Sequence, residues 1–143
     1  AVGDNRVREQ LTERALKAGL EPDTIVSPGA LVAADVALGP GTMVSAGAVI
    51  VTGASIGQGV IINTGATIDH DDRIGDFVHI CPGAHLAGHV EVGRRTMIGI
   101  GASLIQEIRI GSDVTIGAGA AVIGDLPDGV TALGVPARIY ARP

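Results

Sequence analysis

The chain has 143 residues, of which 46% are hydrophobic, and it carries a formal net charge of −5. This length suits one modest domain, and the negative charge argues against a surface that binds nucleic acid. Phe77 and Tyr140 are the only aromatic residues, so Val, Ile, Leu and Ala must fill the core. We therefore expect a narrow and regular core.

The cysteine count and the absence of targeting signals bear on the compartment. Cys81 is the single cysteine, so the chain can form no internal disulfide, and a reducing compartment is expected. We find no signal peptide and no apolar run long enough to span a bilayer. The expectation is a cytoplasmic protein that does not enter a membrane.

Residues 1–22 differ in pattern from the rest of the chain. Residues 5–18 carry apolar side chains at helical spacing, with Asn5 as the expected N-cap and Gly19 as the expected stop. Residues 1–3 suggest the tail of a strand. Because a strand tail and one helix cannot bury a core, we interpret residues 1–22 as the C-terminal remnant of a truncated α/β domain.

A repeat of six residues dominates the remainder of the chain. Every sixth residue from position 26 to position 122 is Val, Ile or Leu, without a break in phase. The members of this aliphatic column are Val26, Val32, Leu38, Val44, Ile50, Ile56, Ile62, Ile68, Ile74, Ile80, Leu86, Val92, Ile98, Leu104, Ile110, Ile116 and Val122. A second column, the small column, lies four residues after each of these and holds small or β-branched residues except at Asp72.

A period of six fits neither a helix nor a simple strand. It fits short strands joined by tight turns, which coil so that one aliphatic residue per side points inward and three sides make a coil of eighteen residues. This pattern resembles the hexapeptide-repeat family, and the resemblance implies an all-β fold, a left-handed parallel β-helix, over residues 23–124. Residues 125–143 leave the period and are expected to close the last coil, where an exposed edge would invite another chain.

All four histidines fall within residues 70–89. His70 comes two residues after the aliphatic column, so it should project outward at a corner, and Gly88 occupies the same place one coil later. Asp71 lies beside His70, and an acidic neighbour makes an imidazole more basic. We expect His85 and His89 to be solvated surface histidines.

The stretch INTGATIDHDDRIGDFVHICPGAHLAGHVEVG, residues 62–93, resembles the bacterial sialic acid O-acetyltransferase family, which includes the sugar-nucleotide N-acetyltransferases that act on 4-amino sugars. The ending GVPARI, residues 134–139, is similar to their common ending. Residues 1–20 resemble the last part of their N-terminal sugar-nucleotide-binding domain. The resemblance implies acetyl transfer from acetyl-CoA to an amine or hydroxyl of a sugar or sugar nucleotide.

The resemblance also implies roles for four residues. His70 matches the family's general base, and Asp71 matches the acidic residue that strengthens it. His79 matches a residue near the acetyl group. Gly88 is a candidate N–H donor to the oxyanion of the tetrahedral intermediate, although a simple turn glycine explains it equally well.

Ile100 and Ala118 match family positions that line acetyl-CoA, and they are eighteen residues apart, hence stacked on successive coils. Glycines flank both, which would let an extended pantetheine arm approach the backbone. In the family this cofactor lies between the prisms of a homotrimer. The chain departs from the family at His89, where Asn is usual, and in lacking the glycine-rich start of the sugar-binding domain.

Two other readings compete. A metal-dependent hydratase of the carbonic anhydrase type shares this fold, and its catalytic zinc needs three imidazoles and an open position. The Gly-His-x4-His stretch of those enzymes is not reproduced here, so we expect no metal. A non-catalytic structural β-helix would explain the hexads but not His70, Asp71 and His79.

Overall fold

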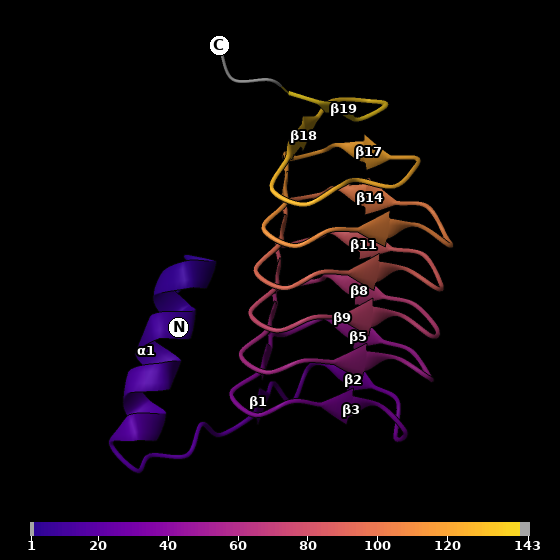
Figure 1. The fold of residues 1–143 in the computed structure, drawn as a ribbon. Coiled ribbons are helices and arrows are strands. Elements are labelled where there is room, and N and C mark those ends of the chain that lie inside the picture. Colours follow the sequence, from indigo (N-terminus) through magenta and orange to yellow (C-terminus); the bar gives the residue numbers. More distant parts are fainter. Residues whose placement is uncertain (1, 141–143) are drawn as a thin grey trace.

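The computed structural model describes residues 2–140, which form one helix beside a stack of short strands (Figure 1). The helix α1 spans Asn5–Lys17, and the stack begins with seventeen strands of two residues each. These strands are β1 (Ile25–Val26), β2 (Leu31–Val32), β3 (Ala37–Leu38), β4 (Met43–Val44), β5 (Val49–Ile50), β6 (Ser55–Ile56), β7 (Ile61–Ile62), β8 (Thr67–Ile68), β9 (Arg73–Ile74), β10 (His79–Ile80), β11 (His85–Leu86), β12 (Glu91–Val92), β13 (Met97–Ile98), β14 (Ser103–Leu104), β15 (Arg109–Ile110), β16 (Thr115–Ile116) and β17 (Ala121–Val122). Two more strands, β18 (Thr131–Leu133) and β19 (Arg138–Ile139), follow at the far end.

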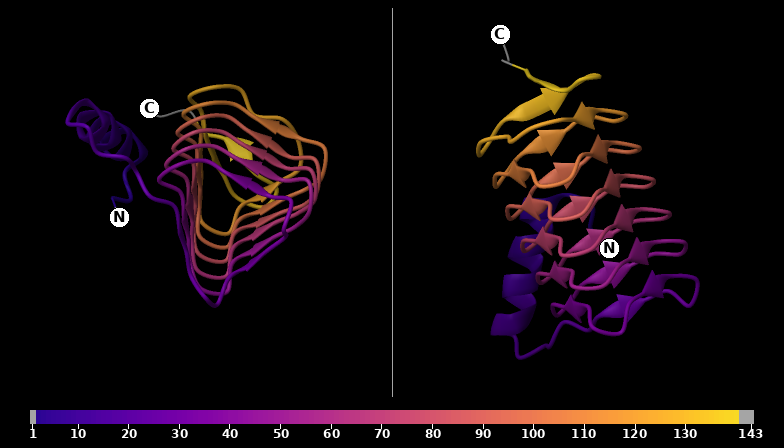
Figure 2. Two further views of the ribbon diagram at one scale, coloured as in Figure 1. Left: turned by 90° about the horizontal axis from the view of Figure 1, so that it is seen from below. Right: turned by 90° about the vertical axis from the view of Figure 1, so that its right-hand side faces the viewer.

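The strands form the three sides of a triangular prism, which Figure 2 shows end on. Sheet A has the order β1-β4-β7-β10-β13-β16-β18-β19, sheet B the order β17-β14-β11-β8-β5-β2, and sheet C the order β15-β12-β9-β6-β3. Pairing between coils is parallel and offset by eighteen residues, as in the register of Ile62 with Ile80 and of Ile80 with Ile98. The architecture is a parallel β-solenoid, consistent with a left-handed β-helix, and it confirms the fold class that the hexads predict.

The core is the stack of inward side chains along the prism axis. Each member of the aliphatic column is the second residue of its strand, and from Val44 to Val122 all of them are buried. The small column fills the space at the corners, and from Thr42 to Ala120 it is buried as well. Val26 differs from the expectation and is 43% exposed, because it belongs to the first coil, whose outer edge has no further coil against it.

The turns at the three corners use the left-handed backbone region in different ways. At the corner between sheets A and B, the residues with positive φ are all glycines, namely Gly47, Gly65, Gly83, Gly101 and Gly119. At the corner between sheets B and C, the B–C corner, the same place is taken by Gly53, Asp71, His89 and Glu107. At the corner between sheets C and A it is taken by Gly41, Gly59, Phe77, Arg95 and Asp113. Side chains other than glycine resist this conformation, so the difference between the corners needs an explanation.

The N-cap of helix α1 lies one residue earlier than expected. Asp4 is the N-cap, since its Oδ1 accepts a hydrogen bond of 2.9 Å from the backbone N–H of Val7. Asn5 lies inside the helix, and its side-chain amide donates to the carbonyls of Arg95 and Thr96 instead. Gly19, with φ +78°, follows the helix end as expected. The helix is not long and apolar enough to cross a membrane.

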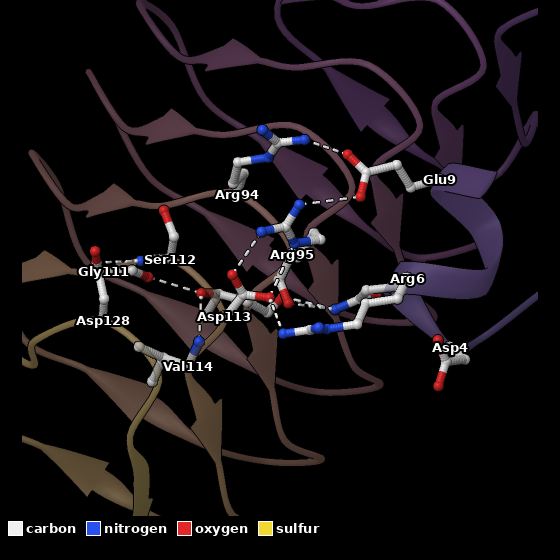
Figure 3. Close-up of polar contacts among 12 residues, drawn as sticks. Asp4, Arg6, Glu9, Arg94, Arg95, Gly111, Ser112, Asp113, Val114 and Asp128 are labelled. Carbon is white, nitrogen blue, oxygen red and sulfur yellow. Dashed lines mark hydrogen bonds and ion pairs between the residues drawn. The ribbon is translucent and has the colours of Figure 1, made fainter. Parts of the chain in front are cut away.

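Charged side chains attach α1 to the prism (Figure 3). Glu9 pairs with Arg94 and Arg95, and Arg95 in turn donates to both carboxylate oxygens of Asp113 at 2.9 and 2.6 Å. Arg6 also reaches Asp113, at 3.0 Å. Because several charges share partners, the network holds the helix more firmly than isolated surface pairs would.

The buried Arg8 adds a second attachment between α1 and the prism. Its guanidinium donates to the carbonyls of Gly59 (2.7 Å) and Phe77 (2.8 Å) in the prism, and to that of Val2 (2.9 Å) before the helix. Val2 and Gly3 form no strand, contrary to the expectation for residues 1–3, and Ala1 lies outside the described residues.

The C-terminal segment packs against the last coil through two further strands. β18 adds to sheet A in parallel beside β16, and β19 then turns back antiparallel to β18. Ala132 of β18 is fully buried against the last coil. The edge of sheet A is therefore covered by a reversed strand, which removes a template for parallel addition of another chain.

The burial of the aliphatic column predicts a large cost for truncating it. Ile98→Ala, at a position with no exposed surface, should lower the free energy of unfolding by about 2–5 kcal/mol, because rigid coils above and below prevent the cavity from collapsing. Ile123→Ala, at a position 54% exposed, is the matched control and should change stability little. Denaturant unfolding measures both, and equal costs at the two positions would contradict the inward column.

Candidate active site

His70 lies in the turn between β8 and β9, at the B–C corner, with its side chain half exposed. Its Nδ1 is 3.0 Å from Oδ2 of Asp71, the next residue, which has φ 61°. A carboxylate can only accept, so this contact places the ring proton on Nδ1 and leaves the lone pair on Nε2 free. The hydrogen bond to Asp71, assisted by the nearby charges of Asp69 and Asp72, raises the pKa of His70 above its usual value.

Gly88 lies directly beneath the His70 ring on the next coil. A Cβ added at Gly88 would stand 2.5 Å from Nε2 of His70 and 2.6 Å from Cε1. The stacking expected from the spacing of eighteen is thus present. Glycine is needed here because any side chain at this position would collide with the imidazole. The spacing in the sequence does not reveal this requirement.

His89 completes the cluster on the coil that carries Gly88. It is exposed, as expected, but its Nε2 lies 3.7 Å from Oδ2 of Asp71, and its ring meets that of His70 edge to face with centroids 5.0 Å apart. The sequence contains a signal for this contact, because His89 follows Asp71 by eighteen residues and therefore stacks on it. His85 lies outside this cluster and contacts Thr67 through its Nδ1, at 2.9 Å.

Two imidazoles and one carboxylate at this corner also offer donor atoms within 4.8 Å of one another. That spacing would suit a divalent cation, but exposed groups of this kind are common without one. The cluster includes only two of the three imidazoles that a hydratase of the carbonic anhydrase type would need. The geometry therefore does not favour that reading.

His79 occupies a different environment on sheet A. Its Nδ1 is 3.3 Å from the carbonyl oxygen of Gly3, and its Nε2 is 3.2 Å from the side-chain nitrogen of Asn63. Nδ1 must donate to the carbonyl, and Nε2 must then accept from the amide, so the ring is neutral. Burial lowers the pKa of His79, and the charge of Arg8 lowers it further. Within one chain the structure does not bring His79 to His70, and Asn63 was not anticipated from the sequence.

Ile100 and Ala118 stack at the corner between sheets A and B, and both are exposed. The N–H of Gly119 bonds the carbonyl of Ile100 at 2.8 Å, so the two turns lie directly over each other. Four of the five glycines of positive φ at this corner face open space. A Cβ added at Gly65, Gly83, Gly101 or Gly119 would meet no atom within 4 Å.

These bare glycines form a track along the corner, which we call the glycine track (Gly47, Gly65, Gly83, Gly101 and Gly119). The backbone conformation alone does not demand glycine, since Asp71 and Arg95 adopt it at the other corners. Internal packing does not demand it either. The track and the His70 corner lie at opposite ends of the strands of sheet B.

Comparison with known proteins places these features in context. No protein-family model and no curated protein matches the chain, but many solved structures do. The acetyltransferase domain of PglB from Neisseria gonorrhoeae FA1090 is 45% identical, with a TM-score of 0.97 over 98% of this chain and 68% of that one. That domain has also been solved with acetyl coenzyme A.

Two further structures extend the comparison. PerB from Caulobacter crescentus, in complex with CoA and GDP-perosamine, is 45% identical, with a TM-score of 0.98 over 99% of this chain and 68% of that one. WeeI from Acinetobacter baumannii AYE is 30% identical, with a TM-score of 0.95 over 98% and 68%. The fold and these likenesses define a class, the hexapeptide-repeat acyltransferases. Within that class, the chain belongs to the sugar N-acetyltransferase family.

The two histidines with opposite environments should titrate in opposite directions. We expect the titration midpoint of His70 to lie above the ordinary histidine value and that of His79 below it, because a carboxylate stabilises the first cation and burial destabilises the second. Asp71→Asn should lower the midpoint of His70 and leave His79 unchanged. Imidazole NMR, assigned with single histidine variants, measures both, and a common midpoint would contradict the described contacts.

Proposed function

We propose that the chain transfers the acetyl group of acetyl-CoA to an amine of a sugar nucleotide, with His70 as the general base. The observation that carries this proposal is the bond between Nδ1 of His70 and Asp71, which leaves Nε2 free and basic at an exposed corner. GDP-perosamine, the sugar nucleotide bound to PerB, is the first acceptor to test. The likeness to acetyltransferases solved with acetyl-CoA and CoA supports the donor.

His70 would act as the acceptor nitrogen attacks the thioester carbonyl. As the C–N bond forms, the nitrogen becomes cationic, and Nε2 of His70 takes one of its protons. Asp71 stabilises the resulting imidazolium through Nδ1. When the C–S bond breaks, the proton on Nε2 is returned to the thiolate of CoA, so the histidine ends the cycle neutral.

The remaining site residues are assigned to acetyl-CoA. The N–H of Gly88, beneath His70, is a candidate donor to the oxyanion, alongside its role in making room for the ring. His79 is assigned to a place near the acetyl group, where its fixed neutral form would keep a positive charge away from the reaction. Ile100 and Ala118 border the glycine track, where an extended pantetheine arm can approach the backbone closely.

A complete site would need two copies of the chain. The glycine track and His70 stand at different corners of one prism, so a cofactor bound along the track reaches a His70 only if another prism presents its B–C corner. We therefore propose a homotrimer with acetyl-CoA between subunits, in which each prism presents its glycine track to the B–C corner of the next and the three head-to-tail contacts close into a ring. Residues 1–22 are proposed as the end of a sugar-nucleotide-binding domain. A cytoplasmic location is proposed on the single, unpaired Cys81.

Replacement of the base should separate chemistry from cofactor binding. His70→Ala should lower the rate of acetyl transfer by about 10²–10⁴-fold, the usual contribution of a general base, and leave acetyl-CoA affinity nearly unchanged. CoA thiol release with GDP-perosamine measures the rate, and calorimetry measures the affinity. His85→Gln, a change at an exposed histidine outside the cluster, is the matched control. Full activity in His70→Ala would refute the assigned role.

The shared site can be tested by complementation between two inactive chains. Ala118→Trp should block the glycine track and raise the KM for acetyl-CoA, whereas His70→Ala removes the base. In trimers co-assembled from equal amounts of both chains, about one quarter of the sites should combine a normal track with a normal His70 and regain activity. A chain that carries both changes, mixed with either single variant, gives the background rate. Co-assembled trimers without activity above that background would place the whole site in one chain.

A further inference from the structure

Asp72 is a buried acid that the mechanism above does not use. It is the one residue of the small column with a titratable side chain, and it has no exposed surface. It directly follows His70 and Asp71, but its side chain is buried inside the prism, at the column position that Ala54 and Val90 occupy on the neighbouring coils. Buried carboxyl groups are rare unless a partner or a function retains them.

Asp72 makes one strong contact, which crosses from its own coil to the next. Its Oδ1 accepts a hydrogen bond of 2.7 Å from the backbone N–H of Val90. Val90 follows Gly88 and His89, the turn that lies beneath His70. The carboxyl group therefore joins the two turns that form the site, from inside the prism.

Two threonines in the same column show what a residue at this position normally does. Thr42 accepts from the N–H of the residue eighteen positions on, at 3.2 Å, and donates its hydroxyl to the carbonyl fifteen positions on, at 2.8 Å. Thr96 does the same at 3.1 and 2.7 Å. The hydroxyl of each threonine therefore accepts one hydrogen bond and donates another.

Asp72 reproduces only the first of these contacts. Among the described residues, its Oδ2 is a buried side-chain oxygen without a hydrogen-bond partner. The carbonyl that corresponds to the threonine acceptors belongs to Ala87. A protonated carboxyl group carries the O–H that this carbonyl would accept, whereas an ionised one would leave a charge unpaired.

The surroundings favour the protonated form over much of the pH range. Burial, above all, raises the pKa of Asp72 to about 7. The backbone N–H groups of Val90 and Asp69 oppose this rise, as does the charge of His70, whereas the charge of Asp69 adds to it. The titratable groups around it are Asp69, His70 and Asp71 on its own turn and His89 on the next coil. Arg73 follows in β9, but its side chain is exposed and stands opposite Glu91. On the preceding coil, Gly53 and Ala54 carry no charge.

We propose that Asp72 is a positioning residue of the acetyl-transfer site, which holds the Gly88–His89 turn beneath His70 and, when ionised, strengthens His70 as a base. This inference rests on the proposed function for its catalytic meaning. In physical terms, the inference states that the protonation of Asp72 and the protonation of His70 affect each other. As the pH rises through neutrality, Asp72 loses its proton, and the new anion favours the protonated imidazole.

The test compares imidazole titrations by NMR in the full chain, with no ligand. Asp72→Asn keeps the shape and both hydrogen-bonding roles of the neutral acid but cannot ionise. The His70 midpoint should therefore fall below that of the wild type, while that of His79, on another sheet, stays unchanged. Thr42→Val is the matched control, since it removes the same kind of tie far from His70 and should lower the melting temperature without moving His70.

A second variant, Asp72→Thr, keeps the proposal testable if Asp72→Asn does not fold. Asp72→Thr introduces the residue that the small column has at positions 42 and 96, so this variant should fold. Its melting temperature, relative to that of the wild type, should rise as the pH increases from about 4 to about 7 and then level off. The sign follows because an acid with a raised pKa in the folded state costs stability once the pH exceeds its unfolded value. In Asp72→Thr the His70 midpoint should also fall.

Acetyl transfer from acetyl-CoA to GDP-perosamine supplies the last readout. In Asp72→Asn, kcat should fall by a few-fold to about tenfold with KM nearly constant, and the acidic limb of the pH profile should move to lower pH. A His70 midpoint that matches the wild type in both Asp72 variants, or that moves equally in Thr42→Val, would overturn the proposal. If the wild type transfers no acetyl group, the proposed function fails, and the NMR titrations still decide the coupling.

Discussion

The structure depends on one constraint, the hydrogen bonding of each coil to the next with an offset of eighteen residues. In this register Ile61 pairs with His79, and His79 with Met97. The N–H groups of Ile61 and His79 bond the carbonyls of the residues just before these partners, Val78 and Thr96, at 3.0 and 2.9 Å. An insertion of one residue within a strand would turn the aliphatic side chain that follows it away from the axis, and the hexad phase is unbroken from residue 26 to residue 122. Because of this register, positions eighteen apart share a surface, and a site can be built from short side chains on successive turns.

Electrostatics then distinguishes histidines that the fold treats alike. His70 lies at the B–C corner and His79 in β10 of sheet A on the next coil, yet the pKa of His70 is raised and that of His79 is lowered. At His70 the hydrogen bond to a carboxylate raises the pKa by more than desolvation lowers it. At His79 burial lowers the pKa by more than the hydrogen bond to the Gly3 carbonyl raises it. The more basic imidazole of His70 and the neutral ring of His79 thus result from their surroundings and not from the fold itself.

Much of this architecture could be predicted from the sequence, because a period of six specifies strands, corners and stacking at once. The stacking of Gly88 against His70 and of Ala118 against Ile100, each on the next coil, follows from that period alone. The partners of side chains at a corner do not follow from it. The contact of His89 with Asp71, the pairing of His79 with Asn63, and the choice of Asp4 over Asn5 as the helix cap depend on rotamers and on segments distant in sequence. The sequence shows Asp72 as an exception in the small column, but its hydrogen bond to Val90 could be found only in the structure.

The left-handed turn residues at the B–C corner carry an evolutionary consequence. A non-glycine residue in this conformation costs on the order of 1–2 kcal/mol. At the corner between sheets C and A, Phe77 offsets that cost by burial, and Arg95 and Asp113 do so by pairing with each other. Asp71, His89 and Glu107 are half exposed or more and gain much less from contacts within the chain. In a lineage that no longer needed acetyl transfer, drift at these three positions should run toward glycine, and the chain would become more stable as it lost its chemistry.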